Sequence, residues 1–141
     1  MTEQPTVAPA RTPAPGAYRA YHYALGVFLV CGAVQIFLAG LGVFSFSGGG
    51  GPGLDPHRFF ALVLAAVALV VVVLAIVART GGRTIGLTVL LFVLVFLVQE
   101  FLAMWGRDSA WFGGLHALDG LLLIGLAGYL FGSSGGAVSR R

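Results

Sequence analysis

The amino-acid sequence predicts an all-α, polytopic membrane protein, built as an up-down-up-down bundle of four transmembrane helices. Hydrophobic residues make up 58% of the 141 residues and charged residues only 9%, whereas a soluble domain carries about 25% charged residues. The hydrophobic residues are concentrated in four runs, at 23–46, 59–78, 85–105 and 116–131. About 20 apolar residues, each rising about 1.5 Å, span a hydrocarbon core of about 30 Å. Short connections between the runs favour antiparallel neighbours.

Composition divides the chain into one membrane domain and two tails. Residues 1–20 are rich in Pro, Ala and Thr and predict a disordered cytoplasmic tail, because such a segment buries too little apolar surface to fold. Residues 21–132 hold the four spans, and residues 133–141 form a second, short tail. Within this sequence, no room remains for a separate soluble catalytic domain.

Arginines set the predicted orientation in the membrane. Six of the eight flank one side of the predicted bundle, namely Arg11, Arg19, Arg79, Arg83, Arg140 and Arg141. Only Arg58 and Arg107 flank the other side. Because positively charged flanks stay in the cytoplasm, both termini and the turn between the second and third spans are predicted to be cytoplasmic. The absence of Lys beside abundant Ala, Gly and Val is typical of a GC-rich bacterial genome, so we expect a bacterial plasma membrane.

Missing patterns exclude several function classes. The sequence has no nucleophile–base constellation, phosphate-binding loop or dinucleotide fingerprint, so it does not indicate an enzyme. The arginines are scattered at helix ends rather than gathered in a patch, so nucleic-acid binding is not expected. The predicted partners are therefore the lipid bilayer and other membrane subunits.

The few polar side chains inside the apolar runs are the functional candidates, because a bilayer makes each of them costly to bury. These candidates are His57, Gln99, Glu100, His116 and Asp119. Asp55 and Pro56 resemble an N-cap followed by a first helical proline. That start places His57 in the first turn of the second span, near its outer end. His116 opens the fourth span at a similar height.

The second and fourth spans resemble each other when they are aligned on their histidines. Leu64 then matches Leu123, and Ala68 matches Ala127. The chain thus reads as two helix hairpins of one kind, each with a histidine at the start of its second helix. Both second helices run inward, so the repeat is parallel, about an axis along the membrane normal.

The two histidines predict a haem site. In an up-down-up-down bundle the second and fourth helices are diagonal, so His57 and His116 can approach one central ligand from opposite sides. This is the arrangement of a haem b iron with two axial histidines. Ala61 and Gly120, one turn below each histidine, would leave space for the flat macrocycle, although small residues on one face also serve close helix packing alone.

The remaining polar residues are expected around this site. Asp119, one turn below His116, could orient an imidazole, and Gln99 and Glu100 should lie in the same layer. Arg58 could pair with Glu100 or a haem propionate, although contact with lipid headgroups is the commoner role. Gln35, near the middle of the first span, is expected to bond to another helix.

These residues also carry a resemblance to a known family. The stretch from His57 to Leu62, a third span ending near Gln99 and a fourth span opening at Leu115-His116 together resemble one four-helix half of haem A synthase. That likeness implies haem ligation by His57 and His116. The family has two such units and a carboxylate one turn before its first histidine, where this chain has Leu54. The chain also looks like uncharacterised small four-helix membrane proteins of bacteria.

Three alternatives to a haem-binding, electron-transfer or haem-handling protein remain. The first is a cofactor-free accessory or structural subunit of a larger membrane complex, which the small-residue helix faces would suit. The second is a transition-metal site built from His57, His116, Glu100 and Asp119, because mixed imidazole and carboxylate ligands suit Zn, Fe or Mn. The third is a small proton-coupled transporter that uses Glu100, although this acid is expected near one surface rather than in the middle of the membrane.

Overall fold

The computed structural model describes residues 15–45, 51 and 53–138, and this part of the chain is helical with short turns. Three of the four long helices are continuous: α1 (Pro15–Phe44), α2 (Asp55–Val77) and α5 (Ala110–Val138). The other long helix joins α3 (Gly82–Val93), the π-helical segment η2 (Leu94–Val98) and α4 (Gln99–Trp105). The all-helical class is therefore confirmed.

Each long helix is long and apolar enough to cross a membrane. The qualifying stretches are Gly16–Phe44, Asp55–Val77, Gly82–Trp105 and Ala110–Gly136. They coincide with the four predicted runs and extend some of them at their ends. The prediction of a multi-pass helical membrane protein is supported at this level.

The helices α1 and α5 extend into both predicted tails. Helix α1 begins at Pro15, so the predicted tail at 1–20 is too long, and residues 1–14 lie outside the described part. A proline suits the first helical position, and Tyr21 is fully buried in the core. At the other end, residues 133–138 are helical rather than a tail, because Ser134 is buried and contacts α1 through His22.

The start of α2 differs from its prediction by one residue. Leu54 rather than Asp55 is the N-cap, and no side-chain capping bond forms there. Asp55 instead lies in the first turn, where its carboxylate is 3.3 Å from the Arg58 guanidinium. A carboxylate in the first helical turn is stabilised by the helix dipole and by a cation three residues later.

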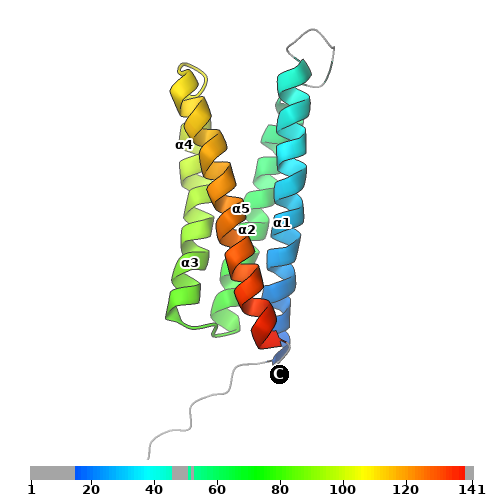
Figure 1. The fold of residues 1–141 in the computed structure, drawn as a ribbon, viewed down its shortest axis with the longest axis vertical. Coiled ribbons are helices and arrows are strands. Elements are labelled where there is room, and N and C mark those ends of the chain that lie inside the picture. Colours follow the sequence, from blue (N-terminus) through cyan, green and yellow to red (C-terminus); the bar gives the residue numbers. More distant parts are fainter. Residues whose placement is uncertain (1–14, 46–50, 52, 139–141) are drawn as a thin grey trace, which may run out of the picture.

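The helices form a bundle in which α2 and α5 are diagonal. Helix α1 packs against α2 and α5, and α2 packs against α3, whereas no close approach of α2 to α5 occurs among the described residues. In Figure 1 the end of α1, the start of α2 and the α4–α5 turn lie at one end of the bundle, and the α2–α3 turn lies at the other. We call the first the distal end and the second the terminal end.

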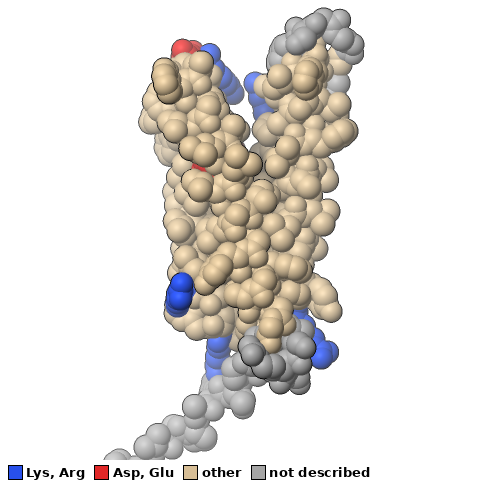
Figure 2. Space-filling view, in the orientation of Figure 1, with Lys and Arg blue, Asp and Glu red and all other residues tan. Residues whose placement is uncertain are grey.

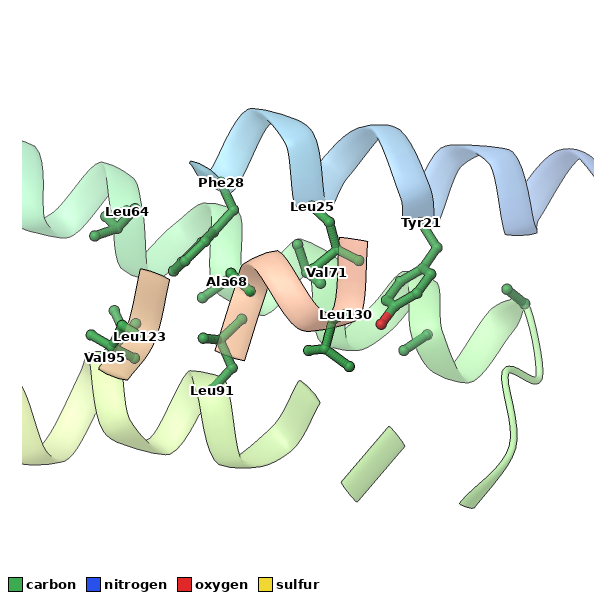
Figure 3. Close-up of a cluster of buried hydrophobic side chains, with 13 residues drawn as sticks. Tyr21, Leu25, Phe28, Leu64, Ala68, Val71, Leu91, Val95, Leu123 and Leu130 are labelled. Carbon is green, nitrogen blue, oxygen red and sulfur yellow. The ribbon is translucent and has the colours of Figure 1, made fainter. Parts of the chain in front are cut away.

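The hydrophobic core lies between the middle of the bundle and its terminal end. Figure 3 shows side chains from all four long helices meeting there, among them Phe28, Leu64, Leu91 and Leu123. These side chains are buried, whereas many other large apolar side chains point outward and stay exposed. An apolar exterior around a small core is what a lipid-facing bundle requires.

The buried residues reveal the predicted hairpin repeat. The buried residues of α2 are Leu64, Ala68, Val71 and Ala75, which follow His57 by 7, 11, 14 and 18 residues. The residues at the same distances from His116, namely Leu123, Ala127, Leu130 and Ser134, are also buried. The two second helices therefore present the same face to the core, and each histidine continues that face toward the distal end.

The bundle opens at its distal end. Helix α4 packs against α5 but has no close approach to α1 or α2 within the described ranges. Figure 2 shows the resulting hollow between the α1–α2 arm and the α4–α5 arm, with basic atoms bordering it from both sides. We call this hollow the distal notch.

Candidate functional site

A glutamine and a histidine in the first hairpin hold each other by two hydrogen bonds. His57 Nδ1 lies 3.1 Å from the backbone carbonyl oxygen of Gln35. In return, Gln35 Nε2 donates to the backbone carbonyl oxygen of His57 over 3.0 Å. The expectation that Gln35 bonds to another helix is therefore confirmed, and its partner is a candidate ligand.

The second hairpin repeats this arrangement. His116 Nδ1 lies 3.2 Å from the carbonyl oxygen of Gln99, and Gln99 Nε2 donates to the carbonyl oxygen of His116 over 3.0 Å. Gln99 directly follows the π-helical segment, and its own N–H bonds to the carbonyl of Leu94. π-turns within α-helices occur frequently at functional sites. We call these two reciprocal contacts the Gln–His pairs.

The backbone carbonyls identify the protonated nitrogen of each ring. A carbonyl oxygen only accepts hydrogen bonds, so Nδ1 of His57 and of His116 must carry the proton. In a neutral imidazole the other nitrogen, Nε2, then keeps its lone pair. The Gln35 amide nitrogen is 3.5 Å from His57 Nε2, which is beyond the usual range of a hydrogen bond. Both rings thus present a lone pair that a metal ion could accept.

The two rings lie close together across the bundle in an edge-on arrangement. Their centroids are 6.2 Å apart and their planes are inclined by 73°. A metal–nitrogen bond is about 2.0–2.1 Å long, and the ring centre lies roughly 1.1 Å beyond the nitrogen. Two imidazoles on opposite sides of one metal ion therefore have their centroids about 6.3 Å apart. The observed centroid separation is close to that value, so the rings are near enough to share one metal ion.

Asp119 lies in the same layer. It is buried, with 6% of its surface exposed, and its carboxyl interacts with the side-chain amide of Gln99 and with His116. Its Oδ2 atom and the Oε1 atom of Gln35 are buried without a hydrogen-bond partner. The layer therefore combines two Gln–His pairs with acceptor oxygens that remain unpaired.

Several of the other predicted site residues lie elsewhere. Glu100 is exposed, because neighbouring helical residues point about 100° apart and Gln99 takes the inward position. Arg58 is exposed and pairs with Asp55 instead of entering the layer. A Cβ on Gly120 would lie 3.6 Å from the Gln99 amide nitrogen, so the space above Gly120 is used by Gln99. Ala61 is half-buried on α2.

The four-ligand metal site predicted as an alternative is not assembled. Among the described residues, no group of three or more His, Cys, Asp or Glu side chains is placed to hold a metal ion. Glu100 is missing from the cluster because it is exposed. The two imidazoles remain as the candidate ligands.

A second polar cluster at the terminal end was not predicted. His22 Nδ1 lies 2.8 Å from the hydroxyl oxygen of Ser134, and its ring stacks on Phe131 with centroids 4.3 Å apart. The hydroxyls of Tyr21 and Thr88 are 3.2 Å apart in the core. These contacts join neighbouring or diagonal helices within the terminal half of the bundle, so we assign them a structural role.

Comparison with known proteins identifies a similarity but no activity. Residues 35–104 match the model of a family of unknown function, DUF6220. The matched segment contains Gln35, His57 and Gln99 and ends before His116. No curated protein and no solved structure matches the chain. The resemblance to haem A synthase therefore rests on the quoted residues alone.

Proposed function

We propose that this protein is a b-type haem protein of the bacterial plasma membrane, with His57 and His116 as the two axial ligands. The observation that supports the proposal is the pair of adjacent imidazoles, with centroids 6.2 Å apart. Their Nδ1 atoms are engaged by backbone carbonyls. Such a bond is the usual way in which a protein fixes the orientation of a metal-binding histidine.

The surroundings of the rings suit the proposed cofactor. The rings come from α2 and α5, which belong to the two arms that border the distal notch (Figure 2), so a bound macrocycle would lie between these arms. Arg58 begins one arm and Arg107 ends the other. Guanidinium groups on both sides of the notch would suit the propionate carboxylates of a haem.

The proposed role is one-electron transfer. A bound haem would supply reversible one-electron oxidation and reduction of its iron, with a potential tuned by axial ligands, hydrogen bonds and burial. His57 and His116 would fill both axial positions, which leaves none for a substrate. The Gln–His pairs would keep both rings in place, and the apolar core would exclude water from the terminal side.

For the membrane arrangement, we propose an up-down-up-down crossing with both termini in the cytoplasm. The distribution of arginines supports this orientation. In that arrangement the distal notch, with its two histidines, opens on the side away from the cytoplasm. Electrons would then enter or leave near the outer surface of the membrane.

An absorption spectrum of detergent-purified protein, made with an ample haem supply, tests this function. We expect a low-spin haem spectrum with a Soret band that sharpens on reduction. His57→Ala and His116→Ala should each weaken haem binding by more than the about 10–100-fold that loss of an outer-shell partner costs. His22→Ala is the matched control, because this histidine bonds Ser134 at the other end of the bundle, and it should keep the spectrum.

A colourless wild type would contradict the proposal. The proposal would also be contradicted if His57→Ala and His116→Ala kept their haem. If the wild type is colourless, the cofactor-free accessory subunit is favoured, and co-purification with a larger membrane complex would then identify it. If the two variants keep their haem, other residues bind the iron.

A further inference from the structure

We propose that Gln35 and Gln99 are positioning residues that set the rotation of the two imidazole rings and hold their planes close to perpendicular. The part of this inference that concerns the iron rests on the proposed function. The part that concerns the rings applies to the protein without haem.

Each Gln–His pair closes a loop between two helices. The ring of His57 is fixed at its β-carbon and again at Nδ1, which donates to the Gln35 carbonyl. That carbonyl belongs to a helical backbone and cannot swing away. The Gln35 side-chain amide donates to the backbone carbonyl of the same histidine. This second bond fixes the distance between α1 and α2 at the level of the ring. The ring is thus left without free rotation about its Cβ–Cγ bond.

The glutamine side chain is the part of this loop that another residue could not replace. Any residue at position 35 would supply the backbone carbonyl. The second bond, however, needs a side chain that carries an N–H donor and is long enough to reach the carbonyl oxygen of His57. Leucine has no donor, and a glutamate would place an oxygen against the carbonyl oxygen of His57. Loss of the amide should therefore free the ring even though its own acceptor is still present.

The same loop in the second hairpin gives the rings their mutual angle. Gln99 bonds His116 with distances within 0.1 Å of those in the first pair. Because each ring is fixed within its own hairpin, their 73° inclination follows from how the hairpins are set against each other. A ferric haem between near-perpendicular imidazoles has a larger principal g value than one between parallel imidazoles, so the angle has a spectroscopic signature.

Nitrogen NMR of haem-free protein with labelled histidine tests the first part. In the wild type we expect the Nδ1–H form for both His57 and His116. Gln35→Leu and the isosteric Gln35→Glu should each mix the two tautomers of His57 and leave His116 unchanged. Gln99→Leu should do the reverse. The His22 signal, assigned through His22→Phe, should stay constant in all three variants and reports that the fold is intact.

Electron paramagnetic resonance of the oxidised, haem-loaded protein tests the second part. We expect a large principal g value in the wild type and a shift to a smaller one in Gln35→Leu or Gln99→Leu. The inference is overturned if either wild-type ring carries its proton on Nε2, or if the glutamine variants leave the tautomers unchanged. If the tautomers behave as expected but no haem binds, the positioning role stands and the proposed function fails.

Discussion

The Tyr21 hydroxyl donates a hydrogen bond to the Thr88 hydroxyl and so joins α1 to α3 across the diagonal of the bundle. The two oxygens are 3.2 Å apart and fully buried. The direction of this bond follows from Thr88, whose own proton goes to the Thr84 carbonyl over 2.8 Å. Tyr21 must therefore be the donor. This is a long-range polar contact in a region that is otherwise apolar.

We predict that Tyr21→Phe lowers the stability of the bundle by about 0.5–1.5 kcal/mol, the usual net value of one hydrogen bond. Thermal unfolding in detergent measures this change. Tyr23→Phe is the matched control, because Tyr23 is 67% exposed, and it should leave the midpoint unchanged. A double-mutant cycle with Thr88→Val should show coupling. Strictly additive effects would contradict the contact.

The turn between α4 and α5 requires glycine at position 106. A Cβ there would lie 2.9 Å from the carbonyl oxygen of Leu102 and 3.1 Å from the backbone of Gly113. Because these atoms belong to the backbone, they cannot move aside at low cost. We predict that Gly106→Ala costs about 1–3 kcal/mol, as overpacking does. Gly114→Ala meets nothing within 4 Å and should be neutral or slightly stabilising. Equal midpoints for the two variants would refute this account.

The bond between Ser134 and His22 ties the end of α5 to α1. Ser134 donates to the Phe131 carbonyl over 2.8 Å, so its oxygen accepts the proton of His22 Nδ1. We predict that Ser134→Ala destabilises the protein by about 1 kcal/mol, because it leaves the imidazole donor unpaired. Ser133→Ala removes only a local bond to Leu130 and should cost less. Hydrogen exchange of the last turns of α5 distinguishes the two variants.

Labelling with a membrane-impermeant maleimide tests the proposed orientation. In a Cys31→Ser background, which removes the single cysteine, we expect Asp108→Cys to react in intact cells. Gly82→Cys, at the α2–α3 turn, should react only after the cells are opened. Both positions are exposed, so a difference in reactivity reports the side of the membrane. The opposite pattern would invert the proposed topology.

Much of the fold could be predicted because long apolar runs of this kind form membrane-spanning helices in a bilayer. The boundaries were less predictable, since they depend on side chains rather than on composition. Residues 133–138 read as a tail because they are rich in Gly and Ser. In the structure these residues continue α5, and Ser134 is buried against His22 of α1, a tertiary contact that composition does not indicate.

The site could be predicted in part. His57 and His116 were found because each lies at the end of an apolar run, and the repeat placed them on equivalent faces. Gln35 was linked to no particular partner, since an isolated amide in an apolar helix shows only that it needs one. The sequence does contain a pattern that places Gln35 on the inward face of its helix. Gln35 follows Tyr21, Leu25, Phe28 and Gly32 at the three- and four-residue intervals of one helix face. The same spacing through Leu91 and Val95 points to Gln99 and away from Glu100.

The apolar residues just below the polar layer have a consequence for the compartments on either side. Leu64, Val95 and Leu123 are buried together beneath the histidines, and the closed core continues from there to the terminal end. In the membrane arrangement proposed above, this layer would separate the imidazoles from the terminal side of the bundle. A charge that reaches the imidazoles would then enter and leave by way of the distal notch.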